Sequence, residues 1–250
     1  MRSRITAAGC VGLGLALCAG GCRSTGPQLS TAQPLSHRVE AQQLVARMQQ
    51  ALTTAFPRNA RVQHRVILTI ARRQFVFNGH LTIQATGAMR LVVLGPMGRV
   101  ADLVADADGK IDVKQHHPKF RERWVKRYIA RDMQLLCAAP DSAQLAAART
   151  PDGTLILEHA LPDTPDVHRY TFGDNGATWE ALSVYRKGRR TYHAVVEQTR
   201  QFSGWNRAMP SSLKVQAKQY QLDITIVDVR PLSVATPPDS KGASSNAVLH

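Results

Sequence analysis

Apolar side chains recur at every second position over much of this chain, and this period constrains the fold more than any other feature. A first run begins near residue 61, where Val62, Val66 and Leu68 alternate with mostly polar neighbours. Successive side chains of a β-strand point to opposite faces of a sheet, so the pattern predicts strands with one buried face. Similar runs continue to residue 113 and resume over residues 154–229. We therefore expect a mainly β domain.

Short turn signals separate these runs and indicate how the strands are connected. They are Asn78-Gly79, Thr86-Gly87, Gly95-Pro96-Met97-Gly98, Asp106-Ala107-Asp108-Gly109, Asp152-Gly153, Asp174-Asn175-Gly176 and Lys187-Gly188. Closely spaced strands joined by such turns are typical of antiparallel meanders. We count ten or eleven strands, and a sheet of that size must curl.

Two segments break the period of two and predict helices. Over residues 39–56, Leu44, Met48 and Leu52 lie four positions apart, which is typical of an amphipathic helix that ends before Pro57. A second helical segment, or two short helices, is expected between Lys119 and Cys137. A curled sheet with two helical segments predicts an α+β arrangement in which helices cover the open side of the sheet.

The N-terminus reads as a targeting signal. In residues 1–21 two arginines precede an apolar stretch that is too short to span a bilayer comfortably. The following Ala19-Gly20-Gly21-Cys22 resembles the lipobox of bacterial lipoproteins, although Ala19 stands where that motif prefers Leu. The resemblance implies that Cys22 carries lipid and begins the mature chain. Arg23, in place of Asp, implies the outer membrane. The alternative is an ordinary secretory signal with a chance cysteine.

The signal also limits the chemistry open to the four cysteines. Cys10 and Cys18 leave with the signal and Cys22 carries lipid, so Cys137 remains alone. We therefore expect neither an internal disulfide nor a cysteine-based zinc site. The apolar neighbours of Cys137 predict a small buried residue.

Beyond the signal, we divide the chain into three parts. Residues 22–38 are rich in Ser, Thr, Gly, Pro and Gln and predict a flexible tether. Residues 39–231 form one domain, and residues 232–250 form a polar, disordered tail.

The formal charge is +14, from 32 Lys and Arg against 18 Asp and Glu. Removing Arg2 and Arg4 with the signal leaves 30 basic residues and a charge of +12. On an exported protein such a charge meets anionic lipid headgroups rather than DNA. We therefore expect no nucleic-acid partner.

The basic stretch from Lys119 to Arg131 has two interpretations. Its interleaved aromatic residues, Phe120, Trp124 and Tyr128, favour either a membrane-surface helix or a helix with an inward aromatic stripe and a solvated basic face.

No catalytic or metal-binding motif accompanies this pattern. The chain contains no Gly-x-Ser-x-Gly elbow, His-Glu-x-x-His pair or phosphate-binding glycine loop. His116 and His117 are adjacent, lack a nearby third ligand, and predict a solvated loop. We expect no enzyme, no cofactor and no metal site.

Met97 places an apolar side chain at the tip of a Gly-Pro-Met-Gly turn. Either this side chain folds back onto the core or it projects into a lipid surface.

Three segments together resemble the LolB-type outer-membrane lipoprotein receptors of the LolA/LolB superfamily, which includes relatives of unassigned function. They are Met89-Arg-Leu-Val-Val-Leu-Gly-Pro-Met-Gly-Arg-Val-Ala-Asp-Leu, the helical insert from Trp124 to Leu136, and Met209-Pro-Ser-Ser-Leu-Lys-Val with Gln221-Leu-Asp-Ile-Thr-Ile-Val-Asp-Val. With the strand order, the resemblance spans residues 40–231.

The resemblance implies an incomplete, half-open β-barrel with a helical lid and an apolar cavity that receives acyl chains. It also implies that Met97 occupies the position of the family's membrane-inserting loop leucine, although Gly95 replaces the usual polar residue. The implied protein is a monomer anchored in the outer membrane and facing the periplasm, which transfers or inserts lipoproteins or other lipids. A periplasmic lipoprotein carrier is its candidate partner.

The alternation selects the residues expected to line the cavity, and a slip of one residue would exchange the two faces. They are Val66, Leu68, Phe75, Phe77, Leu81, Ile83, Leu91, Val93 and Leu103 from the strands, with Trp124 and Leu136 from the lid. The alternative function is a structural or interaction lipoprotein of an envelope assembly, with the same fold, a packed core and no ligand. A periplasmic hydrolase is disfavoured because no nucleophile and base pair is visible.

Overall fold

The structure, a computed structural model, describes residues 33–34, 38–138, 140, 145–161 and 164–232. The expected signal peptide over residues 1–21, the lipidation site Cys22, most of the tether and all of the tail except residue 232 lie outside these residues. No helix in the described part of the chain is both long enough and apolar enough to cross a bilayer.

The described residues build one antiparallel sheet of thirteen strands. In spatial order it runs β1-β7-β8-β9-β10-β11-β12-β13-β2-β3-β4-β5-β6. The strands are β1 Gln33–Pro34, β2 Ala60–Ile70, β3 Arg73–Ile83, β4 Met89–Gly95, β5 Gly98–Ala105, β6 Ile111–His116, β7 Leu145–Arg149, β8 Leu155–Ala160, β9 Asp166–Gly173, β10 Thr178–Arg186, β11 Arg189–Gln201, β12 Ala208–Ala217 and β13 Gln221–Pro231.

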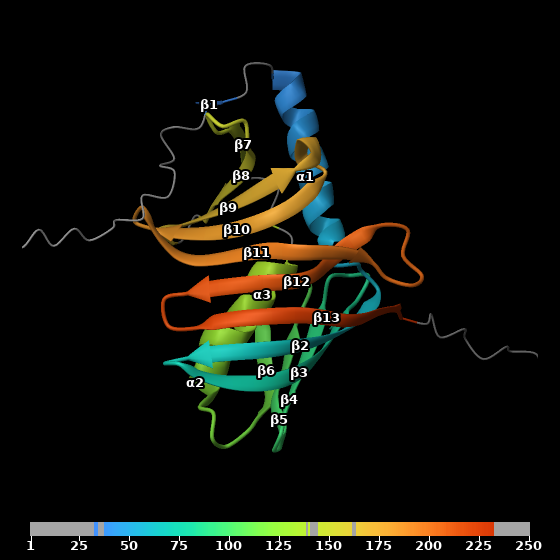
Figure 1. The fold of residues 1–250 in the computed structure, drawn as a ribbon, viewed down its shortest axis with the longest axis vertical. Coiled ribbons are helices and arrows are strands. Elements are labelled where there is room, and N and C mark those ends of the chain that lie inside the picture. The colour runs from blue at the N-terminus through green and yellow to red at the C-terminus, as the bar shows by residue number, and fades with distance from the viewer. Residues whose placement is uncertain (1–32, 35–37, 139, 141–144, 162–163, 233–250) are drawn as a thin grey trace, which may run out of the picture.

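The pairing of β13 with β2 joins an early and a late group of strands into this sheet (Figure 1). The two ends of the sheet, β1 and β6, do not pair with each other, so the curled sheet stays open. This confirms the prediction of a mainly β fold built as an incomplete barrel with helices over it.

Two helical segments cover the concave side of the sheet. Helix α1, Arg38–Ala55, packs against β7, β10 and β12 through a stripe that includes the fully buried Met48. The second segment is continuous and consists of α2 Glu122–Val125, a π-helical turn η2 Lys126–Ala130, and α3 Arg131–Cys137. In Figure 1 this green segment crosses behind β12 and β13.

Helix α1 depends on a glycine at its contact with the short 3-10 turn η4, Asp174–Gly176. Gly176 has a φ of +90°, and a Cβ there would lie 2.9 Å from Leu44 and 3.1 Å from Met48. The predicted Asp174-Asn175-Gly176 turn therefore also leaves the space in which helix α1 packs.

The predicted turn at Asn78-Gly79 is wrong, because both residues lie inside the continuous strand β3. The chain turns instead at Ala71 and Arg72, both with positive φ, between β2 and β3. Gly79 is required for space and not for turning: a Cβ there would lie 2.0 Å from the imidazole of His64, its partner across the two strands. A glycine inside a strand often marks such a close approach.

Strand β7 lies in a segment where we expected no strand, and β1 lies within the predicted tether. Leu145-Ala-Ala-Ala-Arg carries too little contrast between its two faces to show a period of two. These two strands account for the larger number observed.

Candidate functional site

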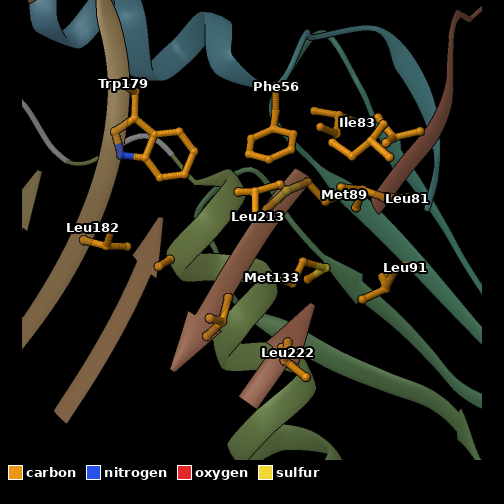
Figure 2. Packing of buried hydrophobic residues seen from close by; sticks show 14 of the residues in the cluster. Phe56, Leu81, Ile83, Met89, Leu91, Met133, Trp179, Leu182, Leu213 and Leu222 are labelled. Atoms are coloured by element: carbon orange, nitrogen blue, oxygen red, sulfur yellow. The ribbon is translucent and has the colours of Figure 1, made fainter. Parts of the chain in front are cut away.

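An apolar cavity of about 210 Å³ lies between the concave face of the sheet and the segment α2-η2-α3. Strands β2 to β5, β12 and β13 form its walls, and Phe56, just after α1, lies at one end. Figure 2 shows Phe56 facing Trp179 of β10, with ring centroids 6.3 Å apart. Binding pockets for drug-sized ligands hold about 300–1,000 Å³, so this cavity is smaller than such pockets.

Eight of the eleven residues expected to line the cavity do so in the structure. Strand pairing places the six of them that belong to strands on one face, since Val66 lies opposite Phe77 and Leu81 lies opposite Leu91. The eight are Val66, Leu68, Phe77, Leu81, Leu91, Val93, Trp124 and Leu136.

The other three expected residues share that face and lie outside the lining. Ile83 and Leu103 are 1% and 0% exposed, because the packed core beyond the cavity encloses them. Phe75 lies opposite Leu68 close to the turn between β2 and β3, and its side chain is 44% exposed.

The sequence did not predict two parts of the lining. One is the wall formed by the last strands, and the other is part of the segment α2-η2-α3, which we call the lid. Leu222, Ile224 and Ile226 of β13 line the cavity at a period of two, and that signal was present in the sequence. Ile129 and Met133 line it from the lid with Leu136, at the spacing of one helix face. The residues of β13 face the same cavity as those of β2 because these two strands pair, and that pairing cannot be read from the sequence.

The polar groups of the lining lie mostly where the lid meets the turn between β12 and β13. The hydroxyl of Tyr220 donates to Oδ1 of Asp132 at 2.7 Å, and the hydroxyl of Tyr128 donates to Gln219. The rings of Tyr128 and Tyr220 meet edge to face at 5.4 Å. These contacts hold the lid against the wall.

Burial changes the ionisation of two polar residues in this lining. It raises the pKa of the Asp132 carboxyl to about 7, against the opposing effects of the Tyr220 hydrogen bond and the Arg131 charge. It lowers the pKa of the His64 imidazole to about 4, and the charge of His80 lowers it further. At neutral pH the cavity therefore holds a neutral imidazole and a carboxyl close to its titration midpoint.

Cys137 lines the cavity as well, and is half-buried by its neighbours. Burial raises the pKa of its thiol to about 12. Because the thiolate is the nucleophile, this cysteine is a packing residue and not a reactive one.

The loop that carries Met97 is a tight connection between β4 and β5. Gly95 pairs with Gly98, and the Met97 side chain between them is 63% exposed. Its nearest polar contact is Lys119, whose Nζ lies 3.7 Å from the methionine sulfur. The side chain therefore projects outward and does not fold back onto the core.

The basic segment after residue 118 presents two faces. Trp124 and Tyr128 line the cavity, and Phe120 stacks on Trp124 at 5.3 Å. Arg121, Arg123 and the neighbouring basic residues are exposed. The inward aromatic stripe is thus present, and a role at a membrane surface stays a prediction.

No cluster of three or more His, Cys, Asp or Glu suited to a metal ion occurs among the residues that the structure describes. His116 ends strand β6, and His117 follows it.

Comparison with known proteins gives similarity in structure alone. No model of a known protein family matches the chain, and no curated protein matches its sequence. A solved DUF1329 family protein from Desulfovibrio piger is similar at a TM-score of 0.50 and 12% identity, covering 79% of this chain and 93% of that chain. This likeness shows the fold.

Two further solved structures align over a similar part of the chain. A LolA superfamily protein from Nitrosomonas europaea has a TM-score of 0.48 and 8% identity, covering 76% of this chain and 92% of its own. An outer-membrane lipoprotein-sorting protein domain from Vibrio parahaemolyticus has a TM-score of 0.49 and 7% identity, covering 78% and 94%. At these scores neither carries an argument about function.

Proposed function

We propose that this protein binds acyl chains of lipoproteins or other lipids in the cavity under its helical lid. In this proposal it acts in lipid or lipoprotein transfer at the outer membrane, held there through lipidated Cys22. The observation that carries the proposal is a cavity with an almost wholly apolar lining inside an incomplete barrel. Holding a chain needs only such a surface, because each buried methylene contributes about 0.8 kcal/mol.

The cavity also favours this function over the structural alternative. A protein that served only as an assembly part would gain stability from a filled interior, since voids forfeit packing contacts. Here Val66, Phe77 and Ile224 face inward and remain only half-buried. An apolar cavity without catalytic neighbours is suited to an apolar ligand.

The small volume of the cavity adds a requirement for the lid, the segment α2-η2-α3. A cargo with several acyl chains would fit only if α2-η2-α3 moved away from the sheet. The π-helical turn η2 lies in the middle of that segment, and such turns are frequent at functional sites. We therefore assign lid movement to this segment.

Co-purification of lipid tests the proposal directly. The domain without residues 1–22 would be produced in the periplasm of a bacterial host and examined by native mass spectrometry. We expect a mass increase that corresponds to bound lipid and that disappears on denaturation. A spectrum containing only ligand-free protein would contradict acyl-chain binding.

A matched variant makes the result specific to the cavity. Val93→Phe adds bulk to a lining residue that is 8% exposed, so the larger side chain occupies space inside the cavity. Val93→Phe should lose the bound lipid, while Val104→Phe, on the adjoining strand β5 and outside the lining, should keep it.

A further inference from the structure

Three hairpins that are neighbours in the sheet turn at the same end of it. Thr69, next to the end of β2, pairs with Gln221 at the start of β13, so the β2–β3 and β12–β13 turns lie together. Tyr192, near the start of β11, pairs with Ala217 at the end of β12, so the β10–β11 turn lies beside them. In Figure 1 these turns lie on the left. Segments far apart in the sequence are therefore gathered at one end of the sheet.

These three turns carry basic side chains and no acidic ones. We call their six exposed basic residues the basic rim: Arg72, Arg73, Lys187, Arg189, Arg190 and Lys218. None of the six takes part in an ion pair among the residues that the structure describes. Like charges on neighbouring turns repel one another, and a negatively charged surface relieves that repulsion.

The cavity reaches the surface at this same end. Ile70, the last residue of β2, and Gln219, between β12 and β13, both line it. Gln219 is the one exposed residue of the lining. At the opposite end, the lining residues Phe56 and Val62 are only 9% and 2% exposed. The open end of the cavity therefore lies beside the basic rim.

Apolar side chains are exposed next to the basic rim. Phe75 and Val76 of β3 are 44% and 39% exposed. Arg73 and Phe75 alternate with their neighbours toward the same face as Phe77, which lines the cavity. Cationic side chains beside an exposed aromatic ring suit the boundary between lipid headgroups and acyl chains. An acidic protein or a nucleic acid would make use of the charges alone.

We propose that the basic rim and Phe75 dock this end of the protein onto a bilayer that contains anionic phospholipid. The rim contacts the headgroup phosphates, Phe75 contacts the apolar layer beneath them, and the open end of the cavity faces the membrane. Docked in this way, the protein can pass an acyl chain between bilayer and cavity without exposing it to water. The inference goes beyond the proposed function, because it concerns the surface that meets the membrane and not the ligand in the cavity.

Vesicle binding tests the docking surface without any cargo. The chain from residue 22 onward, carrying Cys22→Ser so that no lipid anchors it, would be sedimented with two kinds of vesicle. One is phosphatidylcholine alone, and the other is an equal mixture of phosphatidylcholine and phosphatidylglycerol. At about 0.1 M salt we expect binding to the anionic vesicles to be at least about tenfold tighter. At about 1 M salt, where screening shortens to about 3 Å, the difference should disappear.

Matched variants locate the surface on the protein. Arg73→Gln with Lys218→Gln should weaken binding to anionic vesicles roughly 25-fold, since each basic residue near such a surface contributes roughly fivefold. The control is Arg61→Gln with Arg65→Gln, which removes the same charge from exposed residues of β2 that take part in no ion pair among the described residues. They lie roughly 15–30 Å along the strand from the turn, so this pair should bind almost as tightly as the wild type.

The apolar part of the surface has its own pair of variants. Phe75→Ala should weaken binding to anionic vesicles severalfold, because the ring no longer enters the bilayer. Val227→Ala, at an exposed residue of β13 outside the lining, should leave binding unchanged.

Three results would overturn the proposal. They are equal binding to both kinds of vesicle, equal losses in the two arginine and lysine pairs, and unchanged binding in Phe75→Ala. Lipid bound inside the cavity is measured separately by native mass spectrometry. Failure of docking is therefore distinguishable from failure of acyl-chain binding.

Discussion

The two halves of the sheet share one alternation of side chains and differ in what covers them. In the packed half, β7–β11, inward residues such as Leu157, Leu182 and Val184 are fully buried, and helix α1 covers part of this face. In the cavity half, β12, β13 and β2–β5, inward residues such as Val66 and Phe77 are only half-buried under α2-η2-α3. The cover over a strand, and not its pattern, decides whether a face becomes core or cavity.

The two covers, helix α1 and the lid, differ in structure. Helix α1 is a single 18-residue α-helix whose buried Met48 reaches the sheet. The lid contains a π-helical turn and carries Asp132 and Tyr128, whose polar partners Tyr220 and Gln219 lie in the turn between β12 and β13. Both covers turn apolar side chains toward the sheet, and the cavity lies under the one that a π-helical turn interrupts.

The largest expected effect comes from shortening one leucine in each half. Leu157→Ala should lower the free energy of unfolding by about 4 kcal/mol, because it opens a new void in a packed region. Leu91→Ala, in the cavity wall, should cost about 2 kcal/mol, the transfer term alone, because the void joins existing space. Urea denaturation measures both. Equal losses would mean that the two halves are packed alike.

A second comparison concerns two buried carboxyls, Asp132 in the segment α2-η2-α3 and Asp166 in β9 of the packed half. Burial raises the pKa of Asp132 to about 7, whereas the hydrogen bonds from Arg186 lower the pKa of Asp166. Folded Asp132 holds its proton above the unfolded pKa of about 3.9, so its contribution to stability falls as the pH rises from about 4 to 7. The contribution of Asp166 has the opposite sign and is lost as the pH falls through its lowered value.

We therefore expect Asp132→Asn to raise the free energy of unfolding at pH 8 by roughly 2–4 kcal/mol and to change it little at pH 4. Asp166→Asn should lower stability at pH 8 by about 1 kcal/mol, because its partner Arg186 is largely exposed. Denaturation at both pH values measures the two signs. A loss of stability in Asp132→Asn at pH 8 would show that this carboxyl is paired.

The period of two predicts which face of each strand is apolar. It cannot predict what covers that face. Val66, Leu81 and Leu91 line the cavity, and alternation accounts for the face on which each one lies. Alternation carries no information about the cover, so Leu103 could not be separated from its neighbours in the wall. The pair Asp132 and Tyr220 lies 88 residues apart, and nothing local in the sequence indicates that the two side chains meet.

The error at Asn78-Gly79 has a similar cause. Asn-Gly favours the positive φ values of a two-residue hairpin turn, yet that conformation occurs at Ala71 and Arg72. Gly79 is needed because the His64 ring of the neighbouring strand occupies the space that a side chain would fill. Local turn preferences carry no information about this contact.

The close approach of Gly79 to His64 can be tested in the cavity half of the sheet. Gly79→Ala should destabilise the protein by about 1–3 kcal/mol, because the added methyl overlaps an imidazole held in the wall. In the double variant with His64→Ala, the cost of the added methyl should nearly disappear. A double-mutant cycle in urea gives the coupling energy. A coupling near zero would show that the two residues do not contact each other.

The smallest change in stability is expected at the exposed loop of the cavity half, where we predict a change in function instead. Met97 and Val227 are both exposed large apolar residues, at 63% and 55%, so replacing either by Glu should alter stability by less than about 0.5 kcal/mol. If Met97 inserts into lipid, Met97→Glu should impair cargo delivery to liposomes, since a carboxylate resists transfer into the bilayer. Val227→Glu, on a strand outside the β4–β5 loop, is the matched control and should deliver normally. Equal delivery by the two variants would remove Met97 from the transfer step while leaving the cavity as the site of binding.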